Sequence, residues 1–322
     1  KSQVKPGDII KQLPTDMPEN GESLGALIED LNRIILPGIT HWQHPNFHAF
    51  FPANSSVESL LAEQITAAIG AQCMVWETSP AAAELEERMC EWLRNAMNLP
   101  REWEGVIQDT ASGATLAAII TAREKVTGFK ANEEGVPAGL RVYCSDQTHS
   151  SIEKAVTLAG LGRKNLVKIA TDDAACMIPA SLEEAIKEDL TNGLTPCCIV
   201  GTIGTTGTLG MDDHSKIGPI AQKFGIWLHV DAAYAGTALL LPELQHLAAG
   251  MEYADSFVFN PHKWMFTNFD CSIYFVKEPE LLIRSMEILP EYLKNSTRGL
   301  VNDYRDWGIP LGRRFRALKL WF

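Results

Sequence analysis

Short apolar runs alternate with amphipathic segments along most of this chain, and this alternation restricts its fold more than any other feature. Continuous apolar runs bounded by turn residues are typical of buried strands, and the spacing of apolar residues between them is helical. Such strands, joined by helices, indicate a mostly parallel sheet that is covered on both faces. We therefore predict an α/β fold with strands at 105–108, 140–144, 166–169, 197–202, 227–230, 256–260 and 272–276.

Helical patterns also occupy the part of the chain before residue 105. Residues 1–20 are polar and contain prolines, which indicates an extended arm. Helical spacing follows at 23–35, 55–68 and 81–97. At the other end, 318–322 lies within an amphipathic pattern that has no stop signal. We expect a helical arm before the sheet and a further helical part after it.

Composition excludes several classes of function. The net charge of −12 at pH 7 disfavours a nucleic-acid partner, since phosphates would find few cations. No 18-residue apolar run is present, so we expect no membrane span. The seven cysteines lack scaffold spacing, and Cys197 and Cys198 lack the spacing of metal ligands. We expect free thiols, no metal and a cytoplasmic protein.

Lys263 and Asp231 are placed unusually for charged residues. Lys263 follows a histidine behind an apolar strand, and Asp231 ends the apolar run 226–230. A lysine at a strand end is most often a surface charge, and an aspartate there is often a helix cap. Together, however, they suit one chemistry: an amine that links covalently to an aldehyde, and a carboxylate that keeps a pyridine nitrogen protonated. These are the requirements of pyridoxal 5′-phosphate (PLP).

Four more segments carry candidates for such a site. His149 follows a strand and opens a helix, where its ring could cover the cofactor. Segment 109–115 leads into a helix whose first N–H groups, with the hydroxyls of Thr110 and Ser112, could bind a phosphate. The hydroxyls of 201–208 could serve the phosphate or the ring, or its glycines could simply form a turn. Tyr292 precedes a polar, glycine-containing stretch suited to a mobile lid.

Several long motifs resemble the aromatic-L-amino-acid decarboxylase group of PLP enzymes, and they cover nearly the whole chain in order. The most specific are 260–264 (NPHKW), 229–236 (HVDAAYAG) and 145–151 (SDQTHSS); others are 40–42, 79–81, 292–294 and 303–315. The resemblance implies a fold type I enzyme that acts as a homodimer on an amino acid, a small-molecule substrate. It also implies an N-terminal dimer-forming part at 1–80, a PLP-binding α/β domain at 81–290, and a lid with the start of a further part at 291–322. The family's small C-terminal domain is absent from this sequence.

The resemblance assigns a role to each candidate. Lys263 is the covalent anchor, Asp231 the partner of the pyridine nitrogen, His149 the stacking residue and Tyr292 the proton donor to the substrate carbon. The remaining implied cofactor neighbours are Thr110, Ala111, Ser112, Thr206, Ala233, Asn260 and His262. The implied substrate pocket contains Trp42, Phe50, Phe51, Pro52, Gln72 and Met74.

The predicted reaction is loss of carbon dioxide from an aromatic L-amino acid to give the amine. Tyr292 favours this outcome, because a phenylalanine at that place accompanies oxidative aldehyde formation in relatives. Gln72 and Met74 replace apolar or aromatic residues, so histidine remains an alternative substrate, and glutamate a weaker one. A non-catalytic protein that kept the fold is a further alternative, because a fold does not establish an activity.

Overall fold

The computed structural model describes residues 2–51, 53–288 and 299–322, and the chain divides into two compact units, 1–52 and 53–322. The first unit is helical. Its α1 helix begins after Ser23, whose hydroxyl accepts a hydrogen bond from the Ala26 N–H at 3.2 Å. Its elements are η1 (Ile10–Gln12), α1 (Leu24–Asp30), the π-helical turn η2 (Leu31–Ile35) and α2 (Leu36–Gly38). The predicted helix at 23–35 thus corresponds to α1 and η2.

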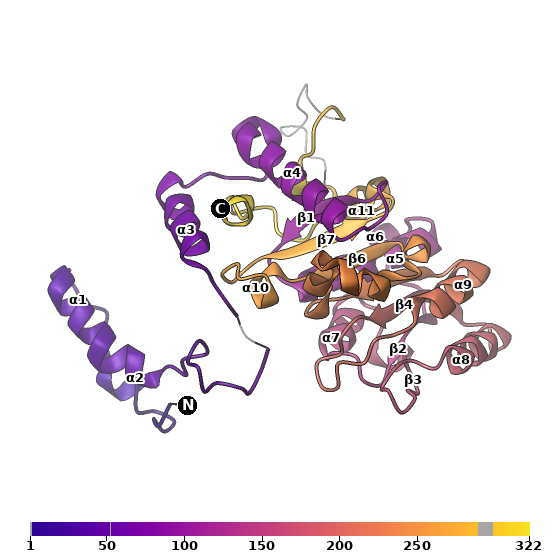
Figure 1. The fold of residues 1–322 in the computed structure, drawn as a ribbon, viewed down its shortest axis with the longest axis horizontal. Coiled ribbons are helices and arrows are strands. Elements are labelled where there is room, and N and C mark those ends of the chain that lie inside the picture. Colours follow the sequence, from indigo (N-terminus) through magenta and orange to yellow (C-terminus); the bar gives the residue numbers. More distant parts are fainter. Residues whose placement is uncertain (1, 52, 289–298) are drawn as a thin grey trace. The chain divides into compact units, whose positions relative to one another are not determined.

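A seven-stranded sheet forms the centre of the second unit (Figure 1). Its order is β1-β7-β6-β5-β4-β2-β3, and β7 is antiparallel to both of its neighbours whereas β6, β5, β4, β2 and β3 are mutually parallel. The strands are β1 (Glu104–Gln108), β2 (Leu140–Ser145), β3 (Leu166–Ile169), β4 (Thr195–Thr202), β5 (Trp227–Asp231), β6 (Ser256–Phe259) and β7 (Ser272–Val276). Each predicted strand is present, with ends shifted by at most a few residues.

Helices cover both faces of this sheet, as the continuous apolar strands predicted. Along β7, Ile273 and Phe275 join one apolar core, whereas Tyr274 and Val276 join the other. The first core includes side chains of α4 (Pro80–Ala96), α8 (Pro179–Thr191), α9 (His214–Phe224) and α12 (Ala317–Trp321). The second includes side chains of α5 (Ala111–Thr127), α7 (Ser151–Leu158) and α11 (Pro279–Met286). The predicted α/β class is confirmed.

The other elements connect or flank these layers. Helix α3 (Val57–Ile69), which corresponds to the predicted helix at 55–68, begins after Ser56, whose hydroxyl accepts the Ser59 N–H at 3.0 Å. The 3₁₀ turn η6 (Pro242–Ala248) starts at Pro242, and Gly250, at φ +91°, follows it. The remaining elements are η3 (Trp76–Thr78), α6 (Ala131–Glu134), η4 (Arg163–Asn165), η5 (Ala235–Leu240), η7 (Met251–Tyr253), α10 (Pro261–Trp264) and η9 (Tyr304–Trp307). No helix in the described ranges is long and apolar enough to cross a bilayer.

Candidate active site

The parallel strands β2, β4, β5 and β6 end at one edge of the sheet, and the loops beyond them enclose a cavity of about 250 Å³. Ligands of such sheets bind at this edge. Every residue predicted to contact the cofactor lines the cavity, although five separate segments supply them. These residues are Thr110, Ala111, Ser112, His149, Thr206, Asp231, Ala233, Asn260, His262 and Lys263.

Asp231 and Lys263 face this cavity from the ends of adjacent strands, Asp231 as the last residue of β5 and Lys263 from α10, which follows β6. Asp231 Oδ1 accepts a hydrogen bond from the Ala233 N–H at 3.0 Å. Burial raises the pKa of Asp231, and the nearby Lys263 opposes that shift. Burial in turn lowers the pKa of Lys263, while Asp231 raises it. Burial therefore favours a neutral, nucleophilic amine beside a carboxylate that a cation would keep ionised.

His149 lies in the loop between β2 and α7. Its Nδ1 lies 2.8 Å from the Ser151 hydroxyl and accepts the Ser151 N–H at 3.2 Å. Among the described residues, its Nε2 makes no hydrogen bond. The ring is thus tied to the start of α7 through one nitrogen only.

The start of helix α5 provides N–H groups for an anion. Thr110 is its N-cap and accepts the Gly113 N–H at 3.3 Å, and Ala111 and Ser112 occupy the first turn. Asp109 Oδ1 accepts the Thr110 N–H at 2.7 Å, which fixes the loop that precedes the helix. A Cβ atom at Gly113 would lie 2.8 Å from that oxygen, so a larger residue there would displace the Asp109 carboxylate. The helix N-terminus suits a phosphate.

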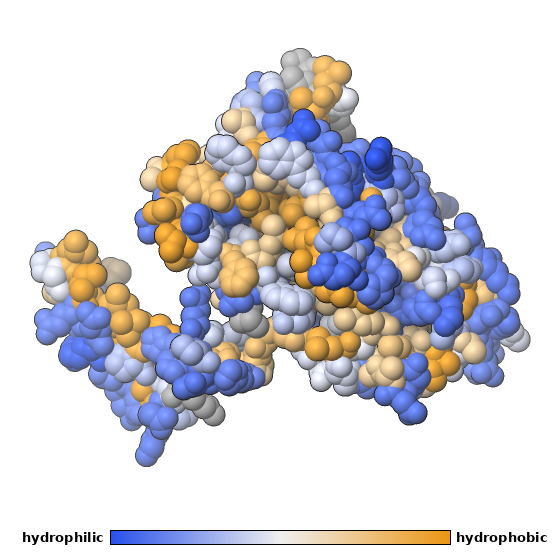
Figure 2. Space-filling view, in the orientation of Figure 1, coloured by the Kyte–Doolittle hydropathy of each residue, from blue (hydrophilic) through white to orange (hydrophobic). Residues whose placement is uncertain are grey.

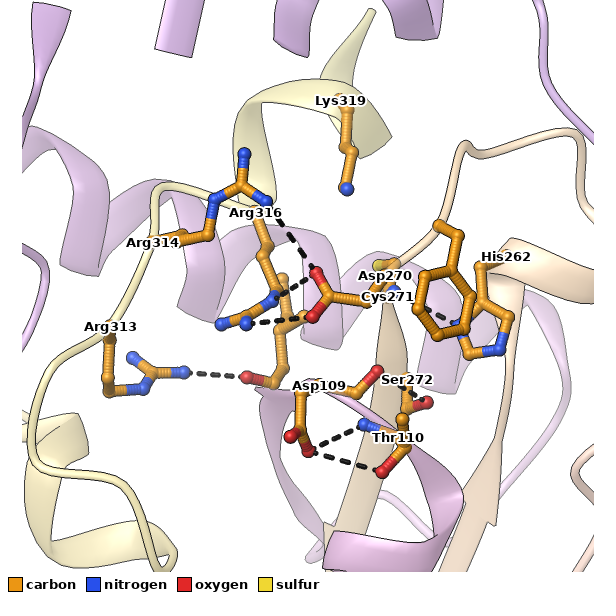
Figure 3. Close-up of polar contacts among 12 residues, drawn as sticks. Asp109, Thr110, His262, Asp270, Cys271, Ser272, Arg313, Arg314, Arg316 and Lys319 are labelled. Carbon is orange, nitrogen blue, oxygen red and sulfur yellow. Dashed lines mark hydrogen bonds and ion pairs between the residues drawn. The ribbon is translucent and has the colours of Figure 1, made fainter. Parts of the chain in front are cut away.

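His262 and Asn260 are held by Cys271 and Ser272, at the start of β7. Figure 3 shows the contact of Cys271 with His262. The Cys271 N–H donates to His262 Nδ1 at 3.0 Å, so the neutral ring carries its proton on Nε2. Burial lowers the pKa of His262 to about 4, which keeps the ring neutral near pH 7. The Ser272 hydroxyl lies 2.7 Å from Asn260 Oδ1. Cys271 and Ser272 therefore fix the positions of His262 and Asn260 in the cavity wall.

The C-terminal segment reinforces this wall with charged side chains (Figure 3). Arg316 binds Asp270 through two hydrogen bonds, Nε–Oδ1 at 3.0 Å and Nη2–Oδ2 at 3.1 Å. Arg313 binds Glu86 in the same bidentate manner and also donates to the Ile107 carbonyl at 2.8 Å. These contacts connect 313–316 to the ends of β1 and β7 that flank the cavity.

Five further residues line the cavity: Ser151, Thr202, Gly204, Thr205 and Tyr234. Three of them belong to segment 201–208, whose hydroxyls the sequence suggested for the phosphate or the ring, whereas Ser151 and Tyr234 were given no role of their own. Thr202 pairs with Asp231 across β4 and β5, and its hydroxyl is buried without a partner in the described part of the chain. Within the described ranges, no cluster of three His, Cys, Asp or Glu side chains could hold a metal ion.

The predicted substrate-pocket residues do not line this cavity. In the first unit, Trp42 stacks on Phe50 with ring centroids 5.4 Å apart, and Phe51 lies next in the chain. In the second unit, Gln72 Oε1 accepts the Arg313 N–H at 2.8 Å, and the Met74 carbonyl accepts the Arg305 N–H at 2.9 Å. Pro52 and Tyr292 lie outside the described residues.

Comparison with known proteins agrees with this geometry. The family model described as "Pyridoxal-dependent decarboxylase conserved domain" matches residues 6–322. The chain belongs to the pyridoxal-dependent decarboxylases. It is 45% identical to an aromatic-L-amino-acid decarboxylase of Bos taurus and 45% identical to a phenylacetaldehyde synthase of Arabidopsis thaliana. Each match covers 99% of this chain, and 68% and 67% of these relatives.

Solved structures of the same family superpose closely on this decarboxylase. The Oryza sativa TDC crystallised with PLP and tryptamine gives a TM-score of 0.96 at 38% identity, covering 99% of this chain and 68% of that one. The Catharanthus roseus tryptophan decarboxylase with L-tryptophan gives 0.92 at 39% identity, with the same coverage. The chain thus spans about two thirds of its relatives' length. The predicted family, fold type, cofactor and carboxy-lyase class are confirmed.

The residues of the cavity fit PLP. An amine whose pKa burial lowers, a buried carboxylate and a helix N-terminus correspond to its aldehyde, its ring nitrogen and its phosphate. The partnerless Thr202 hydroxyl is a further polar atom in this wall. All of these groups belong to one compact unit, 53–322.

Proposed function

We propose that this chain decarboxylates an aromatic L-amino acid to the corresponding amine and carbon dioxide. The observation that carries the proposal is the meeting of Lys263, Asp231, His149 and the start of α5 around one cavity. Relatives named for tyrosine and tryptophan decarboxylation support an aromatic substrate, at 44% and 43% identity. The solved relatives that hold tryptamine and L-tryptophan support it further.

Each cavity residue has a task in this proposal. PLP, when bound, withdraws electrons from the substrate carbon that loses its carboxylate. Lys263 anchors the cofactor aldehyde, and Asp231 holds the proton on the ring nitrogen through a charge-assisted hydrogen bond. His149 covers the ring. Thr110, Ala111, Ser112 and His262 bind the phosphate, while Thr206, Ala233 and Asn260 surround the ring.

Tyr292 is proposed as the group that donates a proton to the substrate carbon after carbon dioxide leaves. The support is the motif 292–294, since the residue lies outside the described part of the chain. Trp42, Phe50, Phe51, Pro52, Gln72 and Met74 are proposed to select the side chain of the substrate. The stacked rings of Trp42 and Phe50 suit a flat apolar group.

We also propose that the protein is a cytoplasmic homodimer. The support is the exposed apolar side chains on α1 and α3, which Figure 2 shows gathered over α3. On α3 they are Val57, Leu60, Leu61, Ile65 and Ile69; on α1 they are Leu24, Leu27 and Ile28. The functional divisions 1–80, 81–290 and 291–322 likewise remain part of the proposal, and the first contains both helices. The buried free cysteines are compatible with a reducing compartment.

A second candidate function is oxidative formation of an aldehyde. The phenylacetaldehyde synthase relative is as similar as the decarboxylase of Bos taurus. Tyr292 favours decarboxylation instead, on the grounds given by the family pattern. A histidine decarboxylase of Mus musculus, at 43% identity, makes histidine the other substrate to test.

The decisive experiment supplies the purified full-length protein and PLP with tryptophan, DOPA, tyrosine, phenylalanine, histidine and glutamate in turn. Mass spectrometry identifies amine or aldehyde, and a peroxide assay separates the two chemistries. We expect amine from at least one aromatic substrate, and no product and no visible cofactor band with Lys263→Ala. The matched control is Lys187→Ala, a lysine half-exposed on α8. Aldehyde with peroxide, or no turnover of any substrate, would contradict the proposal.

A further inference from the structure

Ser151 lies beside the ring of His149 and contacts it in two ways. Its hydroxyl is 2.8 Å from His149 Nδ1, and its backbone N–H donates to the same atom at 3.2 Å. A backbone N–H is always a donor, whereas a hydroxyl can donate or accept. Because the backbone N–H can only donate, Nδ1 of His149 has to accept this hydrogen bond through its lone pair.

The position of the neutral ring's proton follows from this contact. A neutral imidazole has one N–H and one lone pair, so an accepting Nδ1 places the proton on Nε2. A ring turned over by 180° would instead set a carbon-bound hydrogen against the Ser151 N–H and leave both Ser151 groups without this acceptor. The observed orientation is thus the one that satisfies Ser151.

The local fold makes Ser151 available for this task. Ser151 is the first residue of α7, and the first N–H groups of a helix have no partner within the helix. Its N–H is therefore directed to His149 at no cost to the helical hydrogen bonds. Ser151 and His149 both line the cavity that contains Lys263 and Asp231.

We propose that Ser151 is a positioning residue that fixes His149 with its Nε2–H directed to the ligand. His149 then meets the ligand as a hydrogen-bond donor, which suits the carboxylate or another electron-rich atom of the substrate, and not as an acceptor. The role of the fixed ring in turnover rests on the proposed function. The orientation and the proton position do not, because they follow from the contacts of Ser151 alone.

The proton position has a direct test. Neutron diffraction from deuterated crystals of the full-length protein with PLP would locate the deuterium atoms on the His149 ring directly. We expect deuterium on Nε2 of His149 and none on Nδ1. Deuterium on Nδ1 would overturn the proposal. This measurement needs no turnover, so it stands even if the protein decarboxylates nothing.

The functional consequence is tested with a pair of neighbouring serines. Ser151→Ala removes the hydroxyl contact, and Ser151→Thr restores a hydroxyl. Ser150→Ala is the matched control, because Ser150 is exposed and its side chain does not cap α7. For Ser151→Ala we expect kcat to fall about three- to ten-fold, the size of one lost hydrogen bond, with unchanged PLP affinity. The kcat values of Ser151→Thr and Ser150→Ala should stay within about two-fold of the parent value. Ser151→Thr keeps the hydroxyl contact with His149, and Ser150 does not make that contact.

Two outcomes would refute the positioning role. One is a Ser151→Ala variant as active as Ser150→Ala. The other is a Ser151→Ala variant whose PLP affinity falls while its kcat at saturating PLP is unchanged, which would make Ser151 a direct cofactor contact. Folding of each variant is checked by circular dichroism, and the parent protein's activity on the substrate panel reports separately on the proposed function.

Discussion

The buried ion pair between Arg313 and Glu86 gives the sharpest prediction about stability. Their side chains are 7% and 2% exposed, and two hydrogen bonds of 2.6 and 3.1 Å connect them. Glu86 also accepts the Ile107 N–H at 2.8 Å. Arg313→Met would leave a buried carboxylate with that one donor. Removing one member of such a pair costs about 3–5 kcal/mol.

The adjacent residue supplies the control. Arg314 is half-exposed and pairs with Glu63, so Arg314→Met should change the free energy of unfolding by about 0–1 kcal/mol. Urea unfolding of PLP-free protein, followed by circular dichroism, measures both variants. The double variant Arg313→Met with Glu86→Gln should recover much of the loss, because no buried charge then lacks a partner and the Gln oxygen still accepts the Ile107 N–H.

The refuting result is a loss below about 1 kcal/mol for Arg313→Met, which would equate it with an exposed pair. Failure of the double variant to recover stability would also contradict the reasoning. It would mean that the contacts of Arg313 with the carbonyls of Ile107 and Cys73, at 2.8 and 3.3 Å, matter more than the charge of Glu86.

Four other predictions follow. Burial lowers the pKa of His229 to about 3, below the ordinary value near 6.5, so the contribution of its neutral ring to stability is full above pH 6.5 and declines as pH falls. Between pH 7 and pH 5, the free energy of unfolding measured with urea should therefore fall by roughly 2 kcal/mol more in the parent protein than in His229→Gln. Leu61→Glu should shift the protein from dimer to monomer in light scattering, whereas Leu190→Glu, exposed on α8, should not. Thr202→Val should weaken PLP binding several-fold without lowering the stability of the PLP-free protein, since its buried hydroxyl has no partner among the described residues; equal affinity would exclude a contact with the cofactor. Asp231→Asn should abolish activity yet leave the PLP-free protein at least as stable, because it removes a charge that burial disfavours; a large loss of stability would contradict this.

The sequence predicted the sheet, and it selected residues that meet around one cavity, because both depend on local patterns. Asp231 ends an apolar strand and Lys263 follows another, and parallel strands bring their carboxyl ends to one edge. A buried strand is short and appears in the sequence as a continuous apolar run, so the first polar residue after the run shows where the strand ends. The start of α5 was predicted only within segment 109–115, and the structure places it at Ala111, because Thr110 caps the helix.

Contacts between distant segments were beyond sequence reasoning. Arg313 and Glu86 are separated by 227 positions, and nothing in either local pattern indicates the other. Ser151 was missed for a different reason, although it is two residues from His149. Its importance depends on the direction of a backbone N–H, which side-chain chemistry does not reveal. Tertiary packing and backbone direction therefore account for most of what was not predicted.

The cavity combines two groups that burial destabilises in their charged forms, and this conflict connects the fold to its chemistry. Burial disfavours the carboxylate of Asp231 and the ammonium form of Lys263, and each group partly offsets the shift of the other. When Lys263 binds an aldehyde it no longer carries an ammonium ion, and Asp231 then needs another cation. A protonated ring nitrogen would supply that cation, and the proposed contact with Asp231 would keep the nitrogen protonated. PLP binding would thus recover the part of the cost of burying Asp231 that Lys263 does not offset, and it would be coupled to the ionisation of this carboxylate.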